Sequence, residues 1–282
     1  MADAPRLPTV LAAHGLGLGP WLYDRWRPQF EAAGFPFRAL TLPGHGSQAD
    51  ASFADVVDFL AAEVAREPGP VVLMAHSFAA LAAQTLLTRQ SLYAAVLICP
   101  LPPGLPPATP AMLRHAPAAL ASLLRGRPFM PSHRAWASTG YSHLTGEDLE
   151  WAIARSSPWP PTLCRDLLRS PPLCPTSVDT PVLVTLGGAD PILPPQRGRV
   201  VGDRFEGIVL KYDELAHSPM LEPGGERMLR DILRFCAEPQ RPRVIESEGF
   251  GPAEGAGHSL RKQRRGERIK KRSAYGQKPA AR

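Results

Sequence analysis

The stretch Val71-Val-Leu-Met-Ala-His-Ser-Phe-Ala-Ala-Leu-Ala-Ala-Gln-Thr-Leu-Leu-Thr88 decides the fold. Its first five residues are continuously apolar, which is typical of a strand buried on both faces of a parallel sheet. From Phe78 onward the chain is apolar and free of glycine and proline, which predicts a helix. Ser77 therefore stands at the apex of a strand-to-helix turn, between the small residues Ala75 and Ala79, which let the two backbones approach.

Such a turn lifts a serine hydroxyl above the sheet and gathers backbone N–H groups of the helix N-terminus beside it. The pattern usual for this turn is Gly-x-Ser-x-Gly, and here alanine replaces both glycines. Taken locally, Ser77 is equally well interpreted as a serine that caps a helix. The two interpretations can be distinguished only by whether later segments of the sequence supply catalytic partners for this serine.

Apolar runs alternate with helical patterns on both sides of this stretch, which predicts an α/β fold with about six mostly parallel strands. The expected strands are residues 7–13, 38–42, 71–75, 94–99, 181–186 and 208–212, and the expected helices are 21–33, 53–66, 78–88 and 226–237.

The alternation is interrupted between residues 101 and 176, where prolines are dense and the helical patches (112–124, 146–155 and 163–168) are short. We therefore expect an α/β core in residues 1–100 and 177–238, with a mostly helical segment inserted at 101–176. A third segment, 239–282, carries 12 Lys and Arg against 4 Glu, so its net charge is +8, whereas the remaining 238 residues carry −2. Few apolar residues and high charge predict a disordered basic tail.

Composition excludes several classes of protein. No apolar run is long enough for a membrane span, and the N-terminus lacks the pattern of a secretory signal. The four cysteines form no CxxC pair, so reduced thiols in a cytoplasmic protein are expected rather than a disulfide scaffold or a zinc site. The histidines of the inserted segment lack the spacing of metal ligands, and we expect neither a metal nor a cofactor.

A nucleophilic serine needs a base within hydrogen-bond reach, and the base needs an orienting acid. Asp190 follows the expected strand at 181–186, and His217 follows the one at 208–212. The order Ser77, Asp190, His217 is the nucleophile–acid–base order of one hydrolase architecture. Asp213 is an alternative acid, and Asp190 as a simple turn residue is the alternative without catalysis.

The negative oxygen formed in acyl transfer needs two backbone N–H donors. Phe78, directly after the serine, supplies one candidate. The glycine-rich loop His14-Gly-Leu-Gly-Leu-Gly19 supplies the other, and Leu16 is the best placed donor. This loop does not match the GxGxxG of dinucleotide-binding proteins.

Five segments, in this order, resemble the signature segments of the α/β-hydrolase superfamily, and more narrowly its esterase, lipase and lysophospholipase-like branch. They are His14-Gly-Leu-Gly17, Leu42-Pro-Gly-His-Gly46, Ala75-His-Ser-Phe-Ala79, Gly187-Gly-Ala-Asp190 and Ala216-His217. The resemblance, which spans residues 7–237, implies Ser77 as nucleophile, His217 as general base and then acid, and Asp190 as its orienter. It also implies loop-bracing roles for His14 and His45 and a side chain of His76 that points away from the nucleophile. In the same way it implies an α/β-hydrolase core in which the segment 101–176 forms a helical cap, or lid, over the site.

The inserted segment holds four aromatic residues that suit a pocket for an acyl chain or aromatic ring, or else form a small core of their own: Trp136, Tyr141, Trp151 and Trp159. The sequence favours a serine hydrolase of carboxylic esters, with a small ester or lipid-like molecule as substrate. The alternatives are a thioesterase, a C–C hydrolase or a lyase on the same fold, or a non-catalytic ligand-binding protein. Contact of the basic tail with nucleic acid or an anionic membrane is the alternative to a merely solvated tail.

Overall fold

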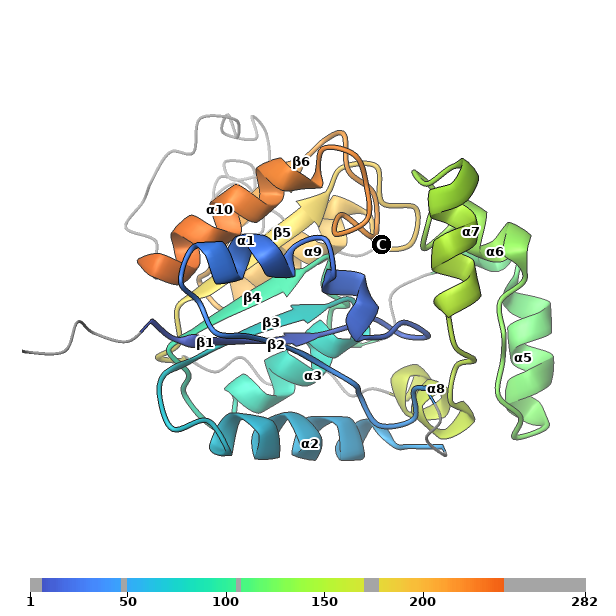
Figure 1. Ribbon diagram of the computed structural model, residues 1–282. Helices are drawn as coiled ribbons and strands as arrows, with labels where there is room; N and C mark the ends of the chain where they lie inside the picture. Colours follow the sequence, from blue (N-terminus) through green and yellow to red (C-terminus); the bar gives the residue numbers. More distant parts are fainter. Residues whose placement is uncertain (1–6, 47–49, 105–107, 170–177, 241–282) are drawn as a thin grey trace, which may run out of the picture. The chain divides into compact units, whose positions relative to one another are not determined.

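The computed structural model describes residues 7–46, 50–104, 108–169 and 178–240. Six strands form one sheet in the order β2-β1-β3-β4-β5-β6, and every neighbouring pair is parallel (Figure 1). The strands are β1 Thr9–Ala13, β2 Phe37–Leu40, β3 Val71–His76, β4 Ala94–Ile98, β5 Val182–Gly187 and β6 Ile208–Tyr212. The six-stranded parallel sheet expected from the sequence is confirmed.

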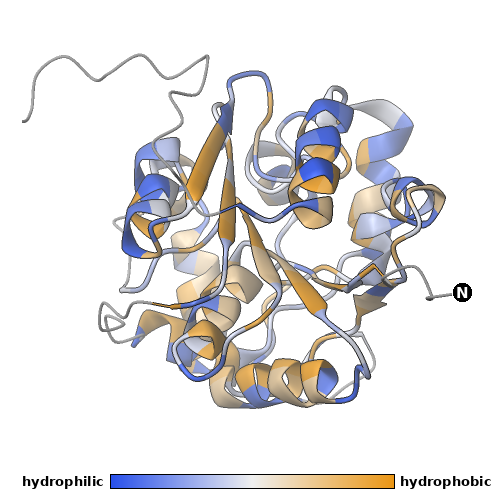
Figure 2. Ribbon diagram, turned by 90° about the vertical axis from the view of Figure 1, so that its left-hand side faces the viewer, coloured by the Kyte–Doolittle hydropathy of each residue, from blue (hydrophilic) through white to orange (hydrophobic). Residues whose placement is uncertain are grey.

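Two helical layers cover the sheet, and the strands bury alternate residues toward each. Val10, Val72 and Val96 face one layer, and Leu11, Leu73 and Leu97 face the other. The first layer holds α1 Arg27–Ala32 and α10 Gly225–Ala237, and the second holds α2 Phe53–Ala65, α3 Phe78–Leu87 and α9 Pro195–Arg204. Figure 2 shows the hydrophobic strands between helices whose hydrophilic sides face outward. Among the described residues, no helix has the length and apolar character that a bilayer crossing requires.

Some of the expected helices were wrong in extent. The single helix expected over residues 21–33 is a short 3-10 helix, Pro20–Tyr23, followed by α1. Pro28 explains the break, because its ring lacks an N–H and is tolerated only in the first turn of a helix. Helix α9 was not expected at all, since its sequence is rich in glycine and arginine. Gly198 and Gly202 let it lie on the sheet, where a Cβ would come within 2.3 Å of Leu186 and 2.1 Å of Val209.

Five further helices lie between β4 and β5 along the chain, and we call residues 108–169 the inserted segment. The helices are α4 Pro110–Leu113, α5 Ala116–Leu124, α6 His133–Ser138, α7 Gly146–Arg155 and α8 Pro161–Leu168. The patch expected at 112–124 is thus divided between α4 and α5. The tail expected from residue 239 lies outside the described residues from residue 241 onward.

Candidate active site

The turn after β3 holds Ser77 in a strained conformation, with φ 57° and ψ −120°. An L-residue rarely adopts a positive φ, and such strain is concentrated at functional turns. The backbone N–H of Ser77 donates to Ile98 O at 3.0 Å, and its carbonyl accepts from Ala80 and Leu101, each at 3.1 Å. The serine side chain remains partly accessible at the carboxyl end of the sheet, at the N-terminus of α3.

Loops after β5 and β6 bring an imidazole and a carboxylate to this serine. His217 Nε2 lies 3.1 Å from Ser77 Oγ, and His217 Nδ1 lies 2.7 Å from Asp190 Oδ2. Both residues are only 5% exposed, so the imidazole and the carboxylate interact with little screening by water. The structure therefore joins the three residues that the sequence singled out into one hydrogen-bonded chain.

The carboxylate of Asp190 is fixed by its own loop. Its second oxygen, Oδ1, accepts the backbone N–H groups of Ile192 at 2.8 Å and Leu193 at 2.9 Å. The alternative acid, Asp213, instead lies 2.5 Å from Lys211 Nζ and is exposed. The geometry thus favours Asp190 over Asp213 as the partner of His217.

Two histidines brace the loops that would hold the oxyanion. His45 Nε2 accepts the N–H of Gly17 at 3.1 Å, and His14 Nε2 accepts the N–H of Leu42 at 3.2 Å. Burial lowers the pKa of both rings, to about 3 for His14, where the neighbouring ring of His45 adds to the effect. Both rings are therefore neutral near pH 7, as an accepting nitrogen requires.

The two N–H groups expected to bind the oxyanion remain available. Neither the Leu16 nor the Phe78 N–H donates a hydrogen bond to another of the described residues. Phe78 is the first residue of α3, where helical N–H groups have no partner within the helix.

Side chains, rather than regular secondary structure, hold the backbone around His217. The carboxylate of Glu222, whose side chain is fully buried, accepts the N–H of Ala216 at 2.6 Å and that of Ser218 at 2.8 Å. Burial raises the pKa of Glu222, and these two donors oppose the effect. The sequence analysis missed Glu222, although a carboxylate in the apolar run Met220-Leu-Glu-Pro223 could have suggested a buried acceptor.

His76 also acts on this loop, in a way that the sequence did not reveal. Its Nε2 lies 2.7 Å from the carbonyl oxygen of His217, and the two rings are 4.9 Å apart. Burial, together with the charge of His217, holds the pKa of His76 well below its usual value, so the neutral ring donates this hydrogen bond from Nε2–H. His76 thus fixes the backbone carbonyl of His217 through a hydrogen bond.

Cys99 completes the surroundings of the acid–base pair. Its thiol donates to the carbonyl of Ala216 at 3.6 Å, and its φ is 42°. The ligand atoms of Cys99, Asp190 and His217 lie within 4.8 Å of one another, so this group has the spacing to hold a metal ion. Burial and the nearby Asp190 carboxylate raise the pKa of the thiol well above its usual value. Metal binding would require this thiol to lose its proton, which its raised pKa opposes.

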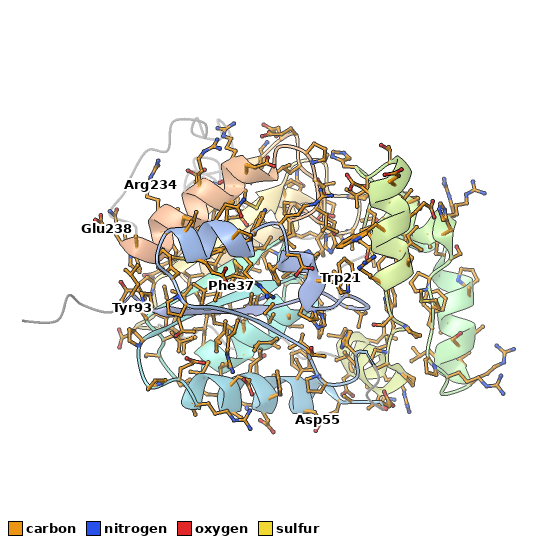
Figure 3. The ribbon with its side chains drawn as sticks, viewed as in Figure 1. Trp21, Phe37, Asp55, Tyr93, Arg234 and Glu238 are labelled. Atoms are coloured by element: carbon orange, nitrogen blue, oxygen red, sulfur yellow. The ribbon has the colours of Figure 1, made fainter. Side chains whose placement is uncertain are left out.

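The four aromatic residues expected to line a substrate pocket pack against different parts of the protein. Trp136 and Tyr141 stack on each other with ring centres 4.9 Å apart, and both are buried in the core. Trp151 packs edge to face on Trp21, which is labelled in Figure 3, at 5.3 Å. Trp159 lies against the glycine-rich loop, since a Cβ on Gly17 would come within 2.6 Å of its Nε1. Trp159 is therefore the aromatic residue of this set that contacts the expected oxyanion loop.

A hollow of about 420 Å³ lies elsewhere, beside the edge strand β2. Phe37, Arg38 and Glu63 line it, and Phe37 is labelled in Figure 3. None of the three side chains of the candidate site lines this hollow. An ion pair of 2.5 Å between Arg38 and Glu63 crosses it, which suits a solvated surface depression.

A strained serine between a parallel strand and a helix, with an acid and a histidine from later loops, defines the architecture of an α/β hydrolase. The chain belongs to the alpha/beta hydrolase family, whose sequence pattern matches residues 10–227. A search among curated proteins finds no match.

Solved structures share the fold at low sequence identity. Polyneuridine aldehyde esterase is 17% identical over 81% of this chain and 98% of its own, with a TM-score of 0.63. A monoacylglycerol lipase from Paleococcus ferrophilus is 19% identical over 83% and 97%, with a TM-score of 0.62. A lipase-esterase related protein from Clostridium acetobutylicum is 12% identical over 81% and 94%, with a TM-score of 0.65.

Proposed function

We propose that this protein is a carboxylic ester hydrolase that works through an acyl-enzyme on Ser77. The observation that carries the proposal is the continuous chain from Ser77 Oγ to His217 Nε2 (3.1 Å) and from His217 Nδ1 to Asp190 Oδ2 (2.7 Å). A serine without such a base is a poor nucleophile at neutral pH. The esterases and lipases among its structural neighbours support the same class of reaction.

In the proposed mechanism, His217 Nε2 takes the proton of Ser77 as the serine oxygen attacks the ester carbonyl. The N–H groups of Leu16 and Phe78 stabilise the resulting oxyanion. Protonated His217 then gives its proton to the leaving alkoxide, and the alcohol departs. Water, deprotonated by His217, attacks the acyl-enzyme and releases the acid. Asp190 keeps its charge throughout and holds the imidazole with Nδ1–H toward itself.

We further propose that the inserted segment acts as a lid over this site. Ser157 N donates to Gly17 O at 2.8 Å, and Ser218 Oγ donates to Gly140 O at 2.7 Å, so the segment is bonded to two loops of the site. Trp159 against Gly17 places an apolar surface beside the proposed oxyanion hole, which favours a substrate with an apolar acyl or aromatic part.

The test is hydrolysis of p-nitrophenyl esters, from acetate to palmitate, by the wild type, Ser77→Ala and Asp190→Asn. We expect Ser77→Ala to abolish turnover and Asp190→Asn to lower it by orders of magnitude, with both variants folded. The acyl length with the highest kcat/KM would measure the space beneath the lid. Turnover by Ser77→Ala at the wild-type rate would refute the nucleophile.

A phosphonylating probe separates the proposal from its alternatives. Labelling of Ser77 together with ester turnover supports the hydrolase. Labelling without turnover of any ester shifts the assignment to a thioesterase or a C–C hydrolase. A folded protein with neither labelling nor turnover indicates lyase chemistry or a ligand-binding role.

A further inference from the structure

Helix α5, in the inserted segment, contributes no residue to the buried core. Leu120 and Leu124 of this helix are 52% and 78% exposed, and Leu113 of α4 is 58% exposed. Arg114 and His115 form a turn between the two helices, so Leu113 lies just before the start of α5. In Figure 1, α5 forms the outer edge of the inserted segment, away from the sheet.

Pro117, Leu120 and Leu124 follow one another at spacings of three and four residues, which puts them on one side of α5. Pro117 is also exposed, and Leu113 lies four residues before it. We call these four residues the α5 face. Single exposed leucines are ordinary, but a stripe of them that nothing covers marks an interaction surface.

The charged residues in the stretch of chain that carries the α5 face have one sign. Residues 101–146 contain four arginines and no aspartate or glutamate. All four are exposed, and none forms an ion pair with a described residue. They are Arg114, Arg125, Arg127 and Arg134. An apolar helical stripe with arginine beside it is the composition of helices that lie in the interface of an anionic lipid surface.

We infer that the α5 face docks on an anionic lipid surface. The leucines would enter the interface while the arginines remain at the level of the lipid phosphates. Docking itself needs no catalysis, but its use to collect an ester from the lipid phase rests on the proposed function.

A short path connects the α5 face to the candidate site. Phe129, five residues after α5, forms an antiparallel bridge with Trp159. Their two backbone hydrogen bonds are 3.1 and 2.8 Å long. Trp159 lies against Gly17, and Ser157 N donates to the carbonyl of Gly17. The chain that leaves the docking helix is thus tied to the expected oxyanion loop, so we expect docking to accompany turnover of a lipid-borne ester.

The experiment compares binding of the full chain to vesicles of phosphatidylcholine alone and of phosphatidylcholine mixed with phosphatidylglycerol. The double variant Leu120→Ser/Leu124→Ser should bind the mixed vesicles about tenfold more weakly, because two large apolar side chains no longer enter the interface. Arg125→Gln/Arg127→Gln should reduce the preference for the anionic vesicles. Val200→Ser is the matched control, since Val200 is 57% exposed on α9, outside the inserted segment.

The basic tail can bind anionic vesicles by charge alone, so a site-specific readout is needed. A polarity-sensitive fluorophore on Leu124→Cys should shift to shorter wavelengths with mixed vesicles, whereas the same label on Val200→Cys should not. Wild type carried through the same labelling reports the background from the native cysteines.

An unchanged fluorophore at position 124 in the presence of mixed vesicles would overturn the inference. A spectral shift that appears without lipid and rises with protein concentration would also overturn it, since it would assign the face to a second copy of the chain. Turnover of the p-nitrophenyl ester series, measured without vesicles, separates the two proposals. Docking without turnover refutes the hydrolase and not the lipid surface, and turnover without docking does the reverse.

Discussion

Replacing Glu222 by glutamine tests whether this buried carboxylate positions the proposed base. The carboxylate accepts two backbone N–H groups, from Ala216 and Ser218, on either side of His217. Glutamine keeps one oxygen but turns an NH₂ group toward the other N–H, so one donor loses its acceptor. A hydrogen bond to a charged group contributes about 1.5–3 kcal/mol, and the loop must shift to recover part of it.

The expected magnitude follows from the geometry of His217. A shift of about 1 Å in a catalytic group costs on the order of 100-fold in rate. We therefore expect Glu222→Gln to lower kcat/KM for p-nitrophenyl acetate by about 10- to 100-fold, chiefly through kcat. KM should change little, because the carboxylate acts through the backbone around His217 and does not itself meet the substrate.

The matched control is Glu214→Gln, which neutralises an exposed carboxylate three residues before His217. It should leave both kcat and kcat/KM unchanged. The unfolding midpoint of each variant, followed by circular dichroism, shows whether the fold survives. A folded Glu222→Gln with wild-type kcat and kcat/KM would refute the positioning role, and so would a lower unfolding midpoint as its only effect.

Three further predictions concern stability and packing. The free energy of unfolding in urea should be about 1 kcal/mol higher for Ser77→Gly than for Ser77→Ala, because a φ of 57° strains any residue with a side chain. Equal free energies of unfolding would contradict this prediction. Burial holds the pKa of His14 at about 3, against 6.5 in the unfolded chain, so the unfolded state binds more protons between these values. The free energy of unfolding should therefore fall by about 1.4 kcal/mol for each pH unit below 6.5, and His14→Gln should reduce that slope. Gly187→Ala should abolish turnover, because its Cβ would lie 1.9 Å from the carbonyl of Ala216, whereas Gly69→Ala, with open space around it, should not.

Local patterns of the sequence predicted the sheet and the residues that meet at its carboxyl edge. Continuous apolar strands place their loops at one edge of a parallel sheet, and this brought Ser77, Asp190 and His217 together as candidates. Glu222 and Cys99 could not be found in this way, because both side chains form hydrogen bonds with the backbone of Ala216, which comes close to them only in the folded loop. Helix α9 was missed for a related reason, since its glycines are explained by contacts with strands far away in sequence.

The inserted segment has hydrogen bonds to three loops of the candidate site, and these bonds bear on how a substrate enters. Thr109 Oγ1 donates to Pro191 O at 2.7 Å, beside the proposed acid. Ser218 Oγ donates to Gly140 O, beside the proposed base, and Ser157 N donates to Gly17 O, beside the proposed oxyanion hole. A lid that opened as one body would break all three bonds and release the loops that must be aligned for reaction. Thr109 is the N-cap of α4, which packs against α5, so opening of the α5 side would also strain the bond at Pro191. The three bonds therefore favour an inserted segment that stays attached, with the acid–base pair assembled, while substrate enters.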